Sequence, residues 1–371
     1  MRIGIDGREF LEHRTGVGRY LGSLCEQWLR LKCGQHEFVI YSPLPGDDLS
    51  ALGPPFTEKT SEHFHHQSVA GRPGTWWEQI QLPLAVHRDQ IDVFFAPAYS
   101  APIQLSIPYV ITMHDVSFAA HPEWFRWREG LRRRLLASHA MTHAKAVITV
   151  SNFSKTEIIR CFDVPAEQVH VIHHGSPPEL SSVSAYEVQT PLILYVGSIF
   201  NRRNLPTLIK AFAKVQAVIP DAQLAIVGAN HTYPKQDLET IVDQNDVGNQ
   251  VNLYEYVTDN KLSTLYRQAR VFVFLSEYEG FGLPPLEALS VGVPIILGDT
   301  AVAREIYGDA SLFVPHTNVA AVAETITTLL GNNAVRSRQQ SRANELLPSF
   351  SWERSAQNTL AVLENAARSR R

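Results

Sequence analysis

The chain has 371 residues, of which 44% are hydrophobic and 19% charged, and its formal net charge is -4. This length predicts two or three domains with ordinary apolar cores, and the charge balance gives no reason to expect nucleic-acid binding. The three cysteines show no CxxC spacing, which argues against a disulfide framework and suits a reducing compartment. The sequence shows no signal-peptide pattern and no run of about 18 apolar residues, so we expect a cytoplasmic chain, soluble or resting on a membrane surface.

The N-terminal half begins with a predicted strand over residues 2–6, a loop containing Gly16 and Gly18, and an amphipathic helix over residues 20–31. A strand, a glycine loop and a helix form the βα unit of a doubly wound parallel sheet, in which a glycine lets the backbone approach a ligand closely. A plain tight turn is the alternative interpretation of the two glycines. Three further strands are predicted over residues 37–41, 93–96 and 108–112.

The third of those strands leads into His114 and Asp115. Side chains at the carboxyl end of a parallel strand face the ligand crevice of such a sheet. We therefore expect His114 to reach a reacting group and Asp115 to fix the loop or the imidazole. The alternative is a histidine that is hydrogen-bonded in the core.

Two segments of this half are rich in tryptophan. Residues 70–83 contain Trp76 and Trp77, which we interpret as core and packing between elements. Residues 124–136 carry five arginines among apolar residues at helical spacing. The apolar stripe consists of Trp124, Trp127, Leu131 and Leu135. This pattern suits an interfacial helix on anionic lipid; the alternative is an ordinary helix buried on one side.

The half closes with predicted strands over residues 146–150 and 169–173, and Ser151 begins an N-cap cluster for a helix over residues 155–161. We interpret the histidines of the last strand as packing residues and not as a metal site, because no carboxylate is evident nearby. A stretch rich in serine and proline, residues 176–190, predicts the linker between two domains.

The second half alternates strands with helices, which predicts another parallel α/β domain. The predicted strands cover residues 192–197, 223–228, 251–257, 270–275 and 293–298. The predicted helices cover residues 205–217, 236–244, 260–268 and 352–367.

The most informative stretch is residues 276–289, which follows a buried strand. A glycine-rich loop leads there into a helix that Pro284 and Pro285 open, so backbone N–H groups and a helix dipole would face any anion bound at this point. Glu279 and Glu287 frame the site, and a carboxylate suits a sugar or ribose diol better than a phosphate. Two solvated glutamates on a surface loop are the alternative.

Arg202 and Arg203 lie at the end of the strand over residues 192–197, just before a helix. An arginine pair in this position is suited to a diphosphate through charge-assisted hydrogen bonds. Taken alone, two solvated loop arginines would explain the pattern as well.

The segment over residues 279–287, EGFGLPPLE, resembles the E-x7-E signature of family 4 retaining glycosyltransferases nearly residue for residue. Other segments are similar to that family at His114 with Asp115 and at Arg202 with Arg203, although Arg203 stands where lysine is usual. The resemblance covers essentially the whole chain. It implies an α/β fold of two Rossmann-like doubly wound domains facing across a cleft (GT-B), with domains at 1–180 and 186–350 and a C-terminal helix, 351–371, packing back across both.

The resemblance also implies roles for individual residues. It makes His114 and Glu279 catalytic and puts Gly18 and Asp115 on the acceptor side, with no metal site. The implied donor-binding residues are Gly16, Ser198, Arg202, Arg203, Tyr256, Val257, Gly280, Phe281, Gly282, Leu283 and Glu287. No Asp-x-Asp motif occurs, which fits a metal-independent reaction in which arginines and a helix N-terminus neutralise the departing charge.

The pattern most resembles bacterial mannosyltransferases of polysaccharide or O-antigen assembly. We therefore expect no cofactor, a GDP-mannose co-substrate and a glycan or polyprenyl-diphosphate-linked saccharide as acceptor. The expected location is the cytoplasm, on the inner face of the plasma membrane if residues 124–136 contact it. UDP-glucose, UDP-GlcNAc and dTDP-rhamnose transferases share these motifs. A sugar-nucleotide 2-epimerase and a non-catalytic nucleotide-sugar-binding scaffold are the rivals from other classes.

Overall fold

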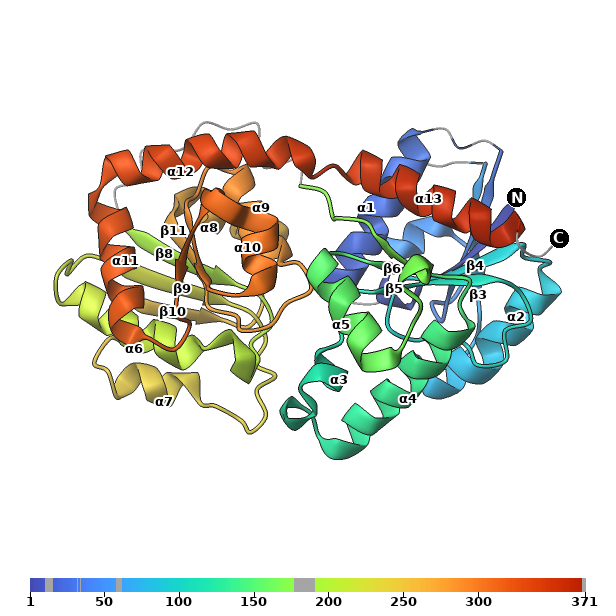
Figure 1. Cartoon of the computed structure of the whole chain (residues 1–371), viewed down its shortest axis with the longest axis horizontal. Coiled ribbons are helices and arrows are strands. Elements are labelled where there is room, and N and C mark those ends of the chain that lie inside the picture. The colour runs from blue at the N-terminus through green and yellow to red at the C-terminus, as the bar shows by residue number, and fades with distance from the viewer. Residues whose placement is uncertain (11–15, 32, 34, 58–61, 177–190, 369–371) are drawn as a thin grey trace. The chain divides into compact units, whose positions relative to one another are not determined.

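The computed structural model describes residues 1–10, 16–31, 33, 35–57, 62–176 and 191–368 (Figure 1). These residues form two compact units. The first comprises Met1–Pro122, Trp127–Gly175 and Ser351–Arg371, and the second comprises Glu123–Arg126 and Ser176–Phe350. The predicted linker over residues 176–190 lies outside the described residues except for Ser176.

The first unit is built on a seven-stranded parallel sheet in the order β3-β2-β1-β4-β5-β6-β7. Its strands are β1 (Arg2–Asp6), β2 (Glu37–Ser42), β3 (Phe64–Ser68), β4 (Val93–Ala96), β5 (Tyr109–Met113), β6 (Ala146–Thr149) and β7 (Val169–Val171). The chain leaves β1 toward β2 and β3 on one side and returns to β4 on the other. The ligand crevice of such a sheet is therefore expected at the carboxyl ends of β1 and β4.

Helices cover this sheet. They are α1 (Gly16–Arg30), α2 (Leu82–Arg88), α3 (Ser117–Ala120), α4 (Trp127–His143), α5 (Asn152–Phe162) and α13 (Trp352–Arg368). The C-terminal helix α13 packs along α1 and against β4 and β5, as Figure 1 shows for α1. The Trp28 indole donates a hydrogen bond to the Ala356 carbonyl at 3.0 Å, which fastens the two helices together.

The second unit repeats the plan with a six-stranded parallel sheet in the order β10-β9-β8-β11-β12-β13. Its strands are β8 (Leu192–Val196), β9 (Gln223–Val227), β10 (Val251–Tyr254), β11 (Ala269–Phe274), β12 (Ile295–Gly298) and β13 (Ser311–Val314). The helices are α6 (Leu205–Gln216), α7 (Leu238–Asp243), α8 (Asp259–Gln268), α9 (Leu283–Ser290), α10 (Ala301–Tyr307), α11 (Val319–Gly331) and α12 (Asn333–Leu346). Figure 1 shows α6 and α7 on one face of the sheet and α9 and α10 on the other.

Both units are therefore α/β domains with parallel, doubly wound sheets, which confirms that part of the predicted fold class. Each sheet has apolar strands that are buried on both faces, such as β5 and β8, and strands were predicted at both positions. Within the described ranges, no helix combines the length and apolar character needed to cross a membrane.

Three expectations need correction. Strands β3 and β13 were not predicted. Trp76 is not packed in the core but is 70% exposed, while its neighbour Trp77 is fully buried. Trp124 does not lie on the helix that carries Trp127, because α4 starts at Trp127 and Trp124 ends a separate 3-10 turn, Pro122–Trp124. The buried side of α4 consists of Gly130, Ala137, Ala140 and Met141, so the predicted apolar stripe is not its buried face.

Candidate active site

In the second unit, the predicted site lies at the carboxyl ends of the adjacent strands β8 and β11. The sheet order reverses direction between these two strands, since β9 follows β8 on one side and β11 lies on the other. Ligands of open α/β sheets bind at such a reversal. The loop after β8 carries the arginine pair, and the loop after β11 carries Glu279 and leads into α9.

Backbone and amide hydrogen bonds join the two loops into one platform. The Glu277 N–H donates to the Arg202 carbonyl at 3.0 Å, and the Asn204 side-chain amide donates to the Leu275 carbonyl at 3.0 Å. Asn204 adopts the left-handed region (φ 53°), a conformation that asparagine tolerates better than most residues. The arginines and Glu279 are therefore held by the same network.

The structure brings Arg203 and Glu279 into direct contact. Arg203 Nε lies 3.0 Å from Glu279 Oε1, and Nη2 donates to Oε2 at 3.2 Å. The guanidinium also lies over the Phe274 ring, 4.5 Å from its centroid. The contact combines one hydrogen bond, from Nη2 to Oε2, with a close ionic approach of Nε to Oε1 that lacks hydrogen-bond geometry. Both use the fork of arginine, which a lysine at this position could not reproduce.

Arg202 is surrounded by aromatic rings. Its guanidinium carbon lies 4.5 Å from the centroid of Phe200 and 5.7 Å from that of Trp124, whose ring contacts Tyr278 edge-on. Among the described residues, the buried Nε of Arg202 and the buried hydroxyl of Ser276 have no hydrogen-bond partner. Buried polar atoms are normally paired, so these two atoms are available to a ligand at the platform.

The N-terminus of α9 is shaped by Gly282, whose φ of 96° lies in the region that favours glycine. Pro284 and Pro285 fill the first turn, as the sequence indicated. The Tyr307 hydroxyl donates a hydrogen bond to the Gly282 carbonyl and so fixes the conformation of this turn. Burial and the charges of Glu279 and Glu287 raise the pKa of Tyr307 well above its usual range, so this hydroxyl keeps its proton.

Glu287 lies in the second turn of α9 and is almost fully buried, at 8% exposure. The Tyr266 hydroxyl, from α8, donates to its Oε2 at 2.7 Å. Tyr266 is itself buried and comes from a different helix, so it fixes the orientation of the carboxylate. Sequence reasoning missed Tyr266 and Tyr307, since nothing in their local sequence marks these contacts.

The other residues that were predicted to bind the donor lie in this unit in different environments. Ser198 is exposed, and its carbonyl accepts a hydrogen bond from the Tyr195 hydroxyl at 3.3 Å. Gly280 and Phe281 are buried in the loop, and Leu283 is the first residue of α9. Tyr256 is 58% exposed and precedes Val257 in the turn between β10 and α8; strands β9 and β8 lie between β10 and β11.

In the first unit, the predicted acceptor-side residues follow β5. His114 Nε2 lies 3.0 Å from the Pro97 carbonyl, and because a carbonyl only accepts, Nε2 carries the hydrogen and Nδ1 keeps its lone pair. The ring packs edge-on against Tyr20 at 4.8 Å. Burial lowers the pKa of His114, so the imidazole is neutral near pH 7. Asp115 accepts from the Ser117 N–H at 2.8 Å and thus fixes the loop, one of its two expected roles.

Gly16 and Gly18 were predicted in a loop before the helix, but the structure places them in the first turn of α1, which begins at Gly16. A side chain added at Gly16 would meet no atom within 4 Å, whereas Gly18 is buried. The remainder of the predicted glycine loop, residues 13–15, lies outside the described residues.

A charged cluster at the carboxyl ends of β1 and β4 was not predicted. Arg8 Nη2 lies 2.6 Å from Asp6 and 2.9 Å from Glu78, and the Ser100 hydroxyl donates to Glu78 at 2.5 Å. Asp6, Glu78 and Ser100 are all buried. Only the position of Asp6 at the end of a predicted strand could have drawn attention to it.

Metal binding stays untested. Within the part of the chain that the structure describes, no three His, Cys, Asp or Glu side chains form a group that could hold a metal ion. The predicted metal independence of the reaction therefore remains a prediction.

Comparison with known proteins identifies two family regions. The family described as "Glycosyltransferase Family 4" matches residues 14–180, and the family described as "Glycosyl transferases group 1" matches residues 178–346. The two matches together run through both predicted domains.

Individual relatives support the same family assignment. O-antigen chain mannosyltransferase B of Escherichia coli is 30% identical over 285 residues, covering 74% of each chain. O-antigen chain mannosyltransferase RfbU of Salmonella typhimurium is 28% identical over 204 residues, covering 55% of this chain and 56% of that protein. Among solved structures, Anabaena Alr3699/HepE in complex with UDP and glucose aligns with a TM-score of 0.76 at 18% identity, over 98% of this chain and 100% of that one.

Proposed function

Because this chain belongs to the family 4 glycosyltransferases, we propose that it moves a hexose from a nucleotide-sugar to a hydroxyl of a glycan or lipid-linked oligosaccharide, with retention at the anomeric carbon. The proposed setting is bacterial polysaccharide or O-antigen assembly, at the inner face of the plasma membrane. The observation that carries the proposal is the platform at the ends of β8 and β11, where the Arg203–Glu279 pair and the N-terminus of α9 meet.

The donor that we propose is GDP-mannose. The support comes from the two relatives named as O-antigen mannosyltransferases. UDP-glucose is the second candidate, because the Anabaena structure that shares this fold is a complex with UDP and glucose.

The diphosphate of the donor suits the loop after β8. Arg202 offers a buried Nε with no partner among the described residues, and Arg203 brings a second positive charge. The N-terminus of α9 adds the positive end of a helix dipole next to them. Each preorganised hydrogen-bonding group of this kind can lower the activation barrier of the transfer by about 3 kcal/mol as charge develops on the departing phosphate.

The two motif glutamates are assigned to hydroxyl groups. Glu287 would accept hydrogen bonds from the ribose diol, in the orientation that Tyr266 gives it. Glu279 would accept from hydroxyls of the transferred sugar while Arg203 keeps its charge balanced. Tyr256 and Val257 would contact the base.

The proposed chemical step is a front-face displacement. The acceptor oxygen forms a bond to the anomeric carbon while the bond from that carbon to the β-phosphate oxygen breaks. The hydroxyl proton passes to the departing phosphate oxygen, so no covalent enzyme intermediate is required. Because Nε2 of the neutral His114 carries the hydrogen, Nδ1 keeps a lone pair that can accept a hydrogen bond. His114 would use this lone pair to orient the acceptor hydroxyl.

The test is turnover with GDP-mannose, UDP-glucose, UDP-GlcNAc and dTDP-rhamnose in the presence of a glycan acceptor, with the product configuration read by NMR. Transfer of mannose with an α-linked product supports the proposal. Inverted product overturns the retaining mechanism. Epimerised nucleotide-sugar without transfer identifies an epimerase, and binding without any turnover identifies a scaffold.

A further inference from the structure

Four residues of the N-terminal half of the sequence, Glu123–Arg126, belong to the second compact unit. Their neighbours along the chain, Pro122 and Trp127, belong to the first unit. The four residues come after the loop of His114 and Asp115 and the short helix α3, and they end where α4 begins. We call them the 123–126 segment.

Trp124 attaches this segment to the loop after β8. The Arg202 guanidinium carbon lies 5.7 Å from the ring centroid of Trp124 and 4.5 Å from that of Phe200. The Trp124 ring also contacts the buried Tyr278 edge-on, with 6.0 Å between the ring centroids and 76° between the ring planes. Since Tyr278 directly precedes Glu279, the indole of Trp124 links the arginine loop to the glutamate loop.

Arg126 gives the segment a second attachment. Its guanidinium carbon lies 5.4 Å from the ring centroid of Tyr233, in the loop after β9. The Asn201 side chain accepts a hydrogen bond from the Tyr233 N–H at 2.6 Å and donates one to the Pro234 carbonyl at 3.1 Å. Asn201 directly precedes Arg202, so the segment rests on two loops that are hydrogen-bonded to each other beside the arginine pair.

These contacts fix Arg202 without using its hydrogen-bonding groups. A guanidinium contacts aromatic rings through its flat faces, whereas its N–H groups point outward in its plane. Among the described residues, the buried Nε of Arg202 has no hydrogen-bond partner. An arginine that is already fixed loses less rotamer freedom when it binds an anion, so it binds that anion more tightly.

We propose that Trp124 is a positioning residue of the transfer reaction, which fixes the plane of the Arg202 guanidinium so that its N–H groups face the diphosphate of the nucleotide-sugar. This inference rests on the proposed function, in which Arg202 binds that diphosphate. Trp124 acts through Arg202 and needs no contact with the ligand. Because all candidate donors carry the diphosphate, the effect of Trp124 is the same whichever base is bound.

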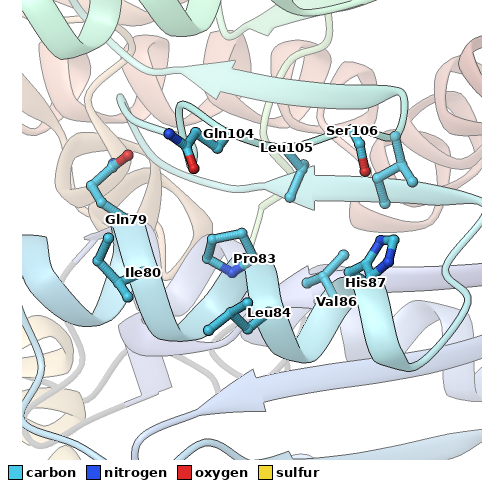
Figure 2. Close-up of a pocket in the computed structure, with 10 residues that line it drawn as sticks. Gln79, Ile80, Pro83, Leu84, Val86, His87, Gln104, Leu105 and Ser106 are labelled. Atoms are coloured by element: carbon cyan, nitrogen blue, oxygen red, sulfur yellow. The ribbon is translucent and has the colours of Figure 1, made fainter.

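The first unit has a pocket of its own, between α2 and residues 104–107. Figure 2 shows Ile80, Pro83 and Leu84 on its helical side and Leu105 on the facing loop. None of the described residues that line it is an arginine or a lysine. A diphosphate would lack a strong counter-charge there, so a substitution in this pocket is a suitable control for nucleotide binding.

The experiment is calorimetric titration of GDP, UDP, dTDP and ADP into the full chain and its Trp124 variants. Positioning of Arg202 predicts about tenfold weaker binding of the preferred nucleoside diphosphate by Trp124→Ala. Trp124→Leu keeps an apolar side chain without a ring, so it should give the same loss and guards against a folding defect. Trp124→Phe keeps a ring over the guanidinium, and its affinity should lie within about threefold of the wild type.

A double-mutant cycle separates positioning from a general loss of structure. In the Arg202→Gln background, Trp124→Ala should lower the affinity by less than about twofold, because the group that Trp124 positions is absent. Two controls should leave the affinity unchanged. They are Trp127→Ala, the same substitution at a 72% exposed position of the first unit, and Leu84→Gln in the pocket of that unit.

The outcomes distinguish the proposed function from this inference. If none of the four nucleoside diphosphates binds the wild type, both are overturned. If the wild type binds one of them and Trp124→Ala binds it equally well, the positioning role alone is overturned. An equal loss from Trp124→Ala with and without Arg202 would also contradict this role, because Trp124 would then act independently of the arginine.

Discussion

The contact between Arg203 and Glu279 allows a quantitative prediction for both stability and activity. The two side chains are only 11% and 17% exposed, and their groups meet at 3.0 and 3.2 Å. Removing one partner of a buried ion pair typically costs about 3–5 kcal/mol, because the other charge is left poorly solvated. Residual exposure places this pair at the lower end, so Arg203→Ala should lower the free energy of unfolding by about 3 kcal/mol.

The effect on turnover should be separate from the loss of stability. Arg203→Lys keeps the charge but loses the two-point contact, so we expect about 1–2 kcal/mol of destabilisation and about a tenfold lower kcat/KM. Arg203→Ala should lower kcat/KM at least about a hundredfold at temperatures where it is folded.

Urea unfolding followed by circular dichroism and initial-rate kinetics measure the two quantities. The matched control is Arg338→Ala on α12, at an exposed position, which should change the free energy of unfolding by less than about 0.5 kcal/mol. The reasoning is refuted if Arg203→Ala is as stable and as active as the wild type. Loss of stability with full activity would leave the pair as structural only.

Three further predictions concern Tyr266, the histidines His114 and His174, and metal. Tyr266→Phe removes a hydrogen bond to the Glu287 carboxylate and should weaken nucleotide binding about tenfold in calorimetry; unchanged affinity would contradict the positioning role. Burial lowers the pKa of His114, and that of His174 well below its usual range, so the unfolded chain binds more protons below about pH 6.5. The free energy of unfolding should therefore fall on acidification from about pH 7.5 to 5.5, and it should fall less steeply in the His174→Gln variant than in the wild type. An equal dependence on pH in the two proteins would refute His174 as a cause. EDTA should leave turnover unchanged, whereas complete loss that Mg²⁺ restores would overturn metal independence.

The parts of the site that could be predicted are those whose signal is local. Strand β11 is a continuous apolar run, and two prolines after a glycine loop mark the start of α9 wherever the helix packs. The arginine pair after β8 could be placed for the same reason. Physical rules about parallel sheets then brought these segments to one edge.

The missed features depend on contacts between distant residues. Arg202 and Trp124 are far apart in sequence, and only the folded chain brings the ring to the guanidinium. Strand β3 (FHHQS) is a polar edge strand without clear alternation, so its sequence does not separate it from a loop. Adjacent tryptophans at 76 and 77 face solvent and core respectively, because consecutive residues of a helix project in different directions, and composition does not show which of them is buried.

The central claim is that the platform between β8 and β11 binds a nucleotide-sugar through Glu287. The most direct test is calorimetric titration of GDP, UDP, dTDP and ADP into the wild type and Glu287→Gln. We predict that GDP binds most tightly and that Glu287→Gln weakens it by about tenfold or more, as expected for hydrogen bonds to a buried carboxylate. Absence of binding by all four nucleotides, or equal affinity in the variant, would contradict the account.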